Sequence, residues 1–189
     1  MDYAAEGPRL PPASGRARLV TLLRNEQLGV QRDLAAERTS VEAVLDACPM
    51  LMDPPPGAPC EWQIDEPELA LALVERLHTL NAVAALDWPQ GRPVRVTPGA
   101  IGQLSLKVQT KQDWLGLQGE LKVDEELVVS LQQLLGWAST HKSRFMPLGD
   151  GRYLALTQEL RERMDDIAAV TESHAQRGHS LADLRVPVL

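Results

Sequence analysis

The residue types that most often perform catalysis are present in this chain, but their spacing builds no familiar site. Its histidines are His78, His141, His174 and His179. No pair of them has the i, i+4 spacing of a helical zinc site, and the two cysteines do not form a Cys-x-x-Cys pair. A Gly-x-Ser-x-Gly turn, which would present a nucleophilic serine, is also missing. We therefore expect neither a metal centre nor nucleophilic catalysis.

Nucleotide hydrolysis requires a different set of residues, and the chain lacks its main part. A motor ATPase needs a glycine-rich phosphate loop ending in Gly-Lys-Ser/Thr, together with an acidic pair that holds magnesium. The sequence has no such loop. Asp124, Glu125 and Glu126 resemble the acidic pair, but they are better interpreted as a helix start, with Asp124 as the cap. We expect no ATP hydrolysis and no bound cofactor in this chain.

Basic side chains near two expected hairpins form the candidate binding patch. They are Lys107, Lys111, Lys142, Arg144 and Arg152. The net charge of the chain is −7, so the overall positive charge of a typical nucleic-acid binder is missing. Lys107 and Lys111 have the same parity along a strand, which favours one sheet face for that pair. The five residues either contact duplex DNA or are scattered surface charges, and the composition favours the second interpretation.

The tryptophans and cysteines have a packing interpretation and a functional one. Trp62, Trp88, Trp114 and Trp137 could stack nucleic-acid bases, but only Trp114 has a nearby lysine. We expect them to pack between elements instead.

Cys48 and Cys60 flank a proline-rich turn, and we expect both to stay reduced.

Hydrophobic periodicity predicts the elements that would position these residues. Apolar residues alternate along 104–108 and 115–123, which predicts a hairpin connected by residues 111–113. A Leu-rich helix is expected at 127–135. The Gly149-Asp150-Gly151 turn predicts a second hairpin, and a second helix is expected at 160–167. On the inward faces of these elements, Leu117, Leu121 and Leu131 should be buried.

The first third of the chain repeats the hairpin-helix layout. Residues 19–30 favour a hairpin with its turn at Asn25-Glu26 over a helix, because Gly29 weakens a helix. Asp33 should cap a helix that runs to about Ala47, with Leu34, Val41, Val44 and Leu45 facing inward.

Further elements are expected beyond the proline-rich stretch. Residues 61–64 read as a short strand, and Asp65 should cap a helix with leucines at 69, 73, 77 and 80. Residues 83–88 and 94–96 should be strands around a turn at Gln90-Gly91.

These patterns predict an α+β fold, in which antiparallel hairpins alternate with helices that pack on one sheet face. We expect a disordered leader at 1–16, a hairpin-helix subdomain at 17–53, and a proline-rich loop or linker at 54–60. The main domain should span 61–173, and 174–189 should form a tail leading toward a missing downstream region. No apolar run approaches the roughly 20 residues of a membrane helix, and no signal peptide is recognisable. A monomer in the cytoplasm is expected.

Several segments resemble one protein family. They are Trp-Leu-x-Leu-x-Gly-x-Leu-x-Val-Asp at 114–124, the Leu-rich stretch 127–135, Arg-Phe-x-x-Leu-Gly-Asp-Gly-x-Tyr-Leu-x-Leu-Thr at 144–157, and the stretch 160–167. An Asp-Trp-Pro-x-Gly step at 87–91 adds to them. Together they resemble the region that precedes the motor in bacterial Swi/Snf-family helicase-like ATPases, well over the last two thirds of the chain and loosely over the first third.

The resemblance implies a non-catalytic accessory or regulatory domain that positions the motor, contacts duplex DNA or binds a partner protein. ATP and magnesium would then belong to the motor domain of the same polypeptide. The alternative is a stand-alone adaptor or small-ligand binding protein, whose hairpin-helix units form a groove. A small hydrolase is least favoured, because the chain shows no catalytic constellation.

Overall fold

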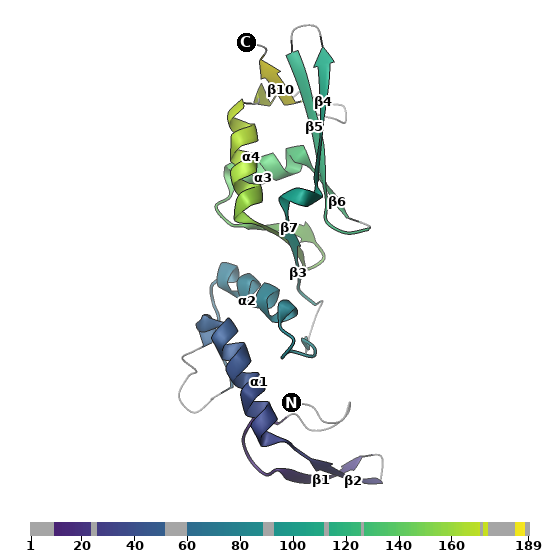
Figure 1. Cartoon of the computed structure of the whole chain (residues 1–189), viewed down its shortest axis with the longest axis vertical. Coiled ribbons are helices and arrows are strands. Elements are labelled where there is room, and N and C mark those ends of the chain that lie inside the picture. The colour runs from purple at the N-terminus through teal and green to yellow at the C-terminus, as the bar shows by residue number, and fades with distance from the viewer. Residues whose placement is uncertain are drawn as a thin grey trace. The chain divides into compact units, whose positions relative to one another are not determined.

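The structure is a computed structural model of the 189-residue chain. It describes residues 10–23, 26–51, 60–88, 93–111, 114–125, 127–170, 172–173 and 184–187. The chain divides into two compact units, unit 1 (residues 1–87) and unit 2 (residues 88–189) (Figure 1). Most of the proline-rich stretch that we predicted as a loop or linker lies outside the described residues.

Unit 1 begins with the predicted hairpin and helix. Strands β1 (Arg18–Leu23) and β2 (Glu26–Gln31) pair antiparallel, with Leu23 opposite Glu26 at the turn. Helix α1 (Leu34–Ala47) follows, and the Asp33 carboxylate accepts hydrogen bonds from the backbone N–H groups of Ala35 and Ala36. These contacts confirm the predicted cap. A short 3-10 helix, η1 (Pro49–Leu51), ends this part.

The second half of unit 1 differs from the prediction at its helix start and its strands. Helix α2 (Pro67–Thr79) has Glu66 at its N-cap, so the predicted cap at Asp65 is wrong by one residue. The Asp65 carboxylate instead accepts a hydrogen bond from the Gln63 amide at 2.8 Å. Residues 61–64 and 83–88 are irregular rather than strands, because no described strand pairs with either segment.

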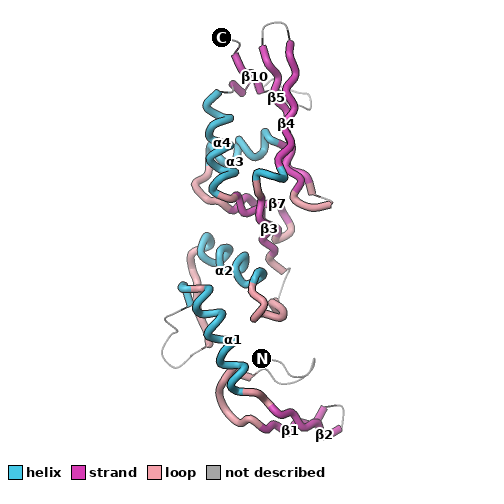
Figure 2. Tube along the Cα trace, viewed as in Figure 1, coloured by secondary structure: helices cyan, strands magenta, loops and turns pink. Residues whose placement is uncertain are grey.

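The larger sheet of unit 2 is built on the predicted hairpin (Figure 2). Strands β4 (Leu104–Lys111) and β5 (Trp114–Lys122) pair antiparallel from Leu104 opposite Leu121 to Lys111 opposite Trp114. Along its other edge, β5 pairs with β6 (Val128–Ser130) and with β10 (Leu184–Pro187), which also pairs with β9 (Glu172–Ser173). A strand from the predicted tail therefore joins this sheet.

The helix that follows β5 starts later than predicted. Helix α3 spans Leu131–Thr140, and β6 occupies the place of its predicted first turn. Asp124 does not cap it; the carboxylate accepts from the Leu127 backbone N–H in the turn after β5. The cap is Ser130, whose hydroxyl accepts from the Gln133 N–H while the Gln133 amide oxygen accepts from the Ser130 N–H. This reciprocal capping box fixes the start of α3.

A second sheet of unit 2 has the strand order β3-β8-β7. Strands β7 (Phe145–Gly149) and β8 (Arg152–Leu156) form the predicted hairpin, in which Asp150 and Gly151 have φ angles of 53° and 73°. Strand β3 (Arg95–Gly99) pairs with β8 in parallel. The predicted antiparallel partner at 83–88 is therefore wrong. A 3-10 helix, η2 (Ile101–Gln103), joins β3 to β4, and helix α4 (Gln158–Val170) follows β8.

Apolar residues from both sheets and both helices of unit 2 form one core. Leu117, Leu121 and Leu131 are 9%, 0% and 2% exposed, which confirms the predicted register. The other core residues are Val123, Val129, Leu134, Leu135, Leu154, Leu156, Leu160, Met164 and Ile167. The described residues form four α-helices and three small, mostly antiparallel sheets, so the predicted α+β class is confirmed.

Candidate functional site

The five basic residues of the predicted patch do not share one sheet. Lys107 and Lys111 lie on β4, whereas Arg152 begins β8 and Arg144 directly precedes β7. Lys142 lies in the connection between α3 and β7. The β4–β5 and β7–β8 hairpins belong to separate sheets, so the strand pairing does not unite the five positions.

Among these residues, Arg144 already has a packing role. Its guanidinium carbon lies 4.1 Å from the centre of the Phe145 ring, and its side chain is half-buried. Its carbonyl accepts a hydrogen bond from the Leu156 N–H, which extends the β7–β8 ladder by one residue. A cation held over an aromatic face stabilises the fold locally. Arg144 is therefore a poor candidate for a freely moving DNA contact.

The polar face of the larger sheet carries a shallow hollow that includes Lys107. We call it the sheet hollow, and its volume is about 300 Å³. It is lined by Ser105 and Lys107 of β4, Gln118, Gly119 and Glu120 of β5, Val128 and Ser130 of β6, and Gln133 of α3. Ser105 lies opposite Glu120, and Lys107 lies opposite Gln118. The alternation that buries Leu117 and Leu121 therefore places polar residues of both strands on this face.

The lining of the sheet hollow combines one cation, one anion, hydroxyls and amides. Lys107 and Glu120 are diagonal neighbours on paired strands, so their charges offset each other at this face. Within this lining, the Ser130 hydroxyl donates to the Gln133 amide oxygen at 3.0 Å. Such a lining suits a small polar ligand better than a polyanion, because no excess of positive charge gathers there.

One basic residue that the sequence interpretation missed lies beside Arg152. Arg95, the first residue of β3, is the register partner of Arg152 in the parallel β3–β8 pair. The two residues are 57 positions apart in the sequence (152 − 95), and their pairing depends on a parallel contact between distant strands. No local motif signals such a contact. Arg95 therefore could not be placed next to Arg152 from periodicity alone.

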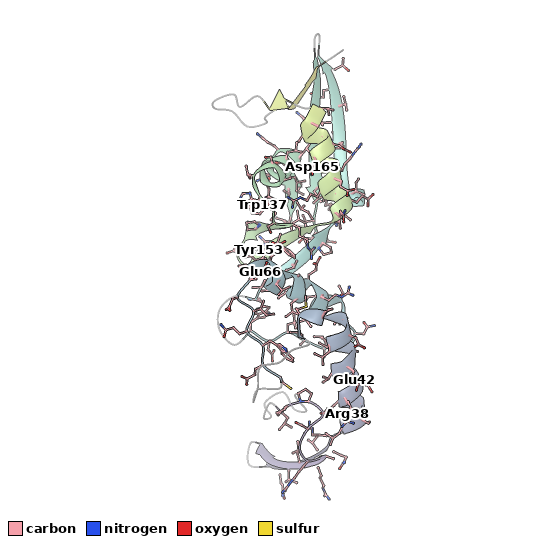
Figure 3. The ribbon with its side chains drawn as sticks, turned by 90° about the vertical axis from the view of Figure 1, so that its left-hand side faces the viewer. Arg38, Glu42, Glu66, Trp137, Tyr153 and Asp165 are labelled. Atoms are coloured by element: carbon pink, nitrogen blue, oxygen red, sulfur yellow. The ribbon has the colours of Figure 1, made fainter. Side chains whose placement is uncertain are left out.

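Trp137 has the packing role that we predicted, since it packs against the core of unit 2. Trp137, which Figure 3 labels, belongs to α3. Its ring stacks on the His141 ring with centroids 3.6 Å apart and planes 8° from parallel. Trp62 and Trp137 are half-buried, and within the described residues their indole nitrogens have no hydrogen-bond partner. Trp88 is more exposed, at 36%, and the Trp114 side chain lies outside the described part.

Both cysteines are free thiols, in different environments. Cys48 is fully buried in unit 1 and Cys60 is exposed. Burial raises the pKa of the Cys48 thiol, while the nearby Arg76 guanidinium opposes this shift. Cys48 is therefore the less reactive thiol.

The described ranges contain neither a candidate metal cluster nor a candidate membrane span. Within them, no group of three or more His, Cys, Asp or Glu side chains is placed to hold a metal ion. No helix in the described ranges is long and apolar enough to cross a membrane.

Comparison with known proteins adds no further identification. No protein-family model matches the chain, and no curated protein or solved structure matches it either. The resemblance to Swi/Snf-family ATPases thus stays a prediction based on the sequence segments that carry it.

Proposed function

We propose that this chain is a non-catalytic accessory domain of a bacterial Swi/Snf-type DNA-dependent ATPase. The supporting observation is that the resembling segments at 114–124, 127–135, 144–157 and 160–167 fold into one unit around one core. Each segment supplies buried residues to that core. Motifs whose residues are buried in a core specify a scaffold rather than a reactive site. We therefore assign the domain a structural or regulatory role.

In this proposal the catalytic residues belong to the motor domain of the same polypeptide, which binds ATP and magnesium. The accessory domain positions the motor or contacts duplex DNA or a protein partner through its polar surface. Lys107, Lys142 and Arg152 are the basic residues of the predicted patch that remain available for such contacts, because their side chains have no hydrogen bond or ion pair among the described residues. We place the protein in the cytoplasm as a monomer.

The test is DNA-stimulated ATP hydrolysis by the full polypeptide. Leu121→Ala should disrupt unit 2 and lower the DNA-stimulated rate several-fold, because Leu121 is fully buried. Val108→Ala is the matched control, since Val108 is 64% exposed on the neighbouring strand. The chain alone should hydrolyse no ATP with or without DNA. A reading frame that contains this chain and no motor, or equal rates for both variants, would contradict the proposal.

A second candidate function is favoured by the sheet hollow. A polar hollow of about 300 Å³ is at the lower end of the volumes of small-ligand sites. If the chain is a stand-alone binding protein, Glu120→Gln and Lys107→Gln should each abolish the thermal stabilisation produced by a polar metabolite. A screen in which no small polar compound raises the melting temperature would eliminate this candidate.

A further inference from the structure

Strands β3 and β8 each begin with an arginine, Arg95 and Arg152. Arg95 and Arg152 are partners in a parallel register, so their side chains leave the sheet on the same face. Neighbouring strands lie about 4.8 Å apart, which brings the two side-chain roots close together. The Arg95 N–H donates to the Gly151 carbonyl at 2.9 Å, so the backbone at this end of the sheet is fixed. The two guanidinium groups therefore start from a rigid and adjacent pair of positions.

Neither guanidinium is neutralised within the described part of the chain. Among the described residues, no hydrogen bond or ion pair joins either arginine side chain to another residue. Arg95 is exposed and Arg152 is half-buried. Like charges directly opposite on paired strands repel and destabilise a sheet. An anion placed between the two groups would remove this repulsion, so the arrangement favours anion binding.

The turn beside the pair is held in a close and unusual conformation. Gly149 and Gly151 have φ angles of 86° and 73°, which L side chains rarely adopt. A Cβ atom on Gly151 would also lie 3.1 Å from the Pro93 carbonyl oxygen, so backbone segments approach closely here. Below the arginines, the next partners on the same face are Thr97 and Leu154, and Leu154 is part of the core. The charged pair is thus anchored directly to the buried core.

We propose that Arg95 and Arg152 form a binding site for a phosphate group. Guanidinium is planar, permanently charged and weakly hydrated, and it matches phosphate oxygens with two parallel N–H donors. Two such groups side by side can bind one phosphate from two directions. The phosphate belongs either to the backbone of duplex DNA or to a free phosphate compound. The DNA source rests on the proposed function. The site itself stands without the proposed function.

The experiment compares the loss of the two arginines with a control of equal net charge, both in the full chain. Arg95→Gln/Arg152→Gln removes the site, and Lys122→Gln/Arg163→Gln removes the same charge from two exposed residues of unit 2. A third variant, Arg95→Lys/Arg152→Lys, keeps the charge but loses the paired donors. Circular dichroism establishes that each variant is folded. Binding of inorganic phosphate is measured by NMR titration, and binding of a short fluorescent DNA duplex by anisotropy.

We expect the Gln pair to weaken phosphate binding at least about tenfold, because one or two charge-assisted hydrogen bonds to the phosphate are lost. The Lys pair should weaken phosphate binding several-fold, and the control pair should change phosphate binding little. If DNA binding falls in parallel, the phosphate is that of DNA. If phosphate binding falls while DNA binding is unchanged, the site stands and DNA contact through it fails. The proposal is overturned if wild type binds neither probe, or if the control variant loses as much as the Gln pair.

Discussion

The two units of this protein are stabilised by different kinds of buried contact. In unit 2 the fully buried residues form a continuous apolar cluster that joins both sheets and both helices. In the described part of unit 1 the buried apolar residues are Cys48 and Leu51, while Arg32 and Glu37 are buried as a charged pair. Apolar burial therefore dominates one unit, and a polar network dominates the other.

The buried pair in unit 1 also organises the segment before the first hairpin. Arg32 contacts Glu37 through two hydrogen bonds of 2.6 and 2.9 Å, with both side chains at most 2% exposed. The guanidinium also donates to the carbonyls of Pro11 and Ser14, and the Ala13 N–H donates to the Glu37 carboxylate. Part of the predicted disordered leader is thus bonded to α1. A buried ion pair with so many hydrogen-bond partners specifies one arrangement of the backbone. An apolar contact has no such directional requirement.

Breaking the ion pair should produce the largest effect on stability. Glu37→Ala leaves the Arg32 charge buried without its partner, and we expect unit 1 to lose about 3–5 kcal/mol. Because Cys48 is buried in the same unit, its rate of modification by a thiol reagent reports the opening of unit 1. Cys48 should react far faster in the variant, while exposed Cys60 reacts at the wild-type rate.

The matched control is Arg32→Met/Glu37→Leu, which removes both charges and keeps apolar volume. Replacing a complete buried pair costs much less than breaking it. The double variant should therefore be more stable than Glu37→Ala, although it loses the bonds to Pro11 and Ser14. Equal destabilisation by both would show that the charge itself is unimportant and that only the lost packing matters.

The corresponding change in unit 2 removes apolar volume. Leu121→Ala should cost about 2–5 kcal/mol, because Leu121 is fully buried in the apolar core of unit 2. Hydrogen exchange should show faster exchange in β5 and α3, with no change in α1. Val108→Ala, on the exposed part of β4, should change stability by less than about 0.5 kcal/mol. A cost below about 1 kcal/mol for Leu121→Ala is incompatible with the register described above.

The same comparison explains which parts of the fold could be predicted from the sequence. Alternating apolar residues predicted both β4 and β5, because that pattern is the direct signature of a half-buried strand. The inward face is correct for Leu117 and Leu121 of β5, whereas Leu106 and Val108 of β4 are 38% and 64% exposed. The Gly149-Asp150-Gly151 turn and the Asp33 cap were likewise local signals with one physical interpretation. Unit 2, whose core follows periodicity, was therefore the more predictable unit around its hairpins.

The failures share a dependence on non-local contacts. Residues 61–64 and 83–88 have strand-like composition, but a strand needs a partner, and none of the described strands provides it. The start of α3 had two competing signals, and the Ser130–Gln133 capping box prevailed over Asp124 because β6 pairs with β5 first. The neighbour of Arg152 could not be predicted for the same reason, since Arg152 pairs with Arg95 in a parallel contact between distant strands.

A second arginine network sharpens the contrast between the units. Arg161 of α4 donates to the carbonyls of His141, Lys142 and Ser143 at 2.7 to 2.9 Å, which ties α4 to the end of α3. Unlike Arg32, it is only half-buried and lies beside an apolar core. Arg161→Ala should cost about 1–3 kcal/mol, less than Glu37→Ala, in a chemical denaturation of unit 2. Arg161→Lys should recover little of the lost stability, because an ammonium group lacks the planar fork of donors that reaches three carbonyls. A loss as large as that of Glu37→Ala would remove the distinction between the units.

The smallest expected effects come from the two helix caps, one in each unit. Asp33→Ala removes the oxygen that accepts hydrogen bonds from the Ala35 and Ala36 N–H groups. Ser130→Ala removes the hydroxyl that accepts from the Gln133 N–H. Each change should cost about 1 kcal/mol, the usual value for an N-cap. The free energies are similar, but their consequences should differ. Unit 1 has little buried apolar surface in its described part, so the same loss is a larger share of its stability.

Hydrogen exchange can measure this difference directly. Asp33→Ala should raise exchange throughout α1 and around Cys48, as local opening spreads through a unit with few apolar contacts. Ser130→Ala should raise exchange only in the first turn of α3, because Leu131 and Leu134 remain buried in the core. Asp33→Asn, which keeps a capping oxygen, should behave almost as wild type. If Asp33→Ala affects only the first turn of α1, then unit 1 is as cooperative and well packed as unit 2, and the contrast between polar and apolar stabilisation does not hold.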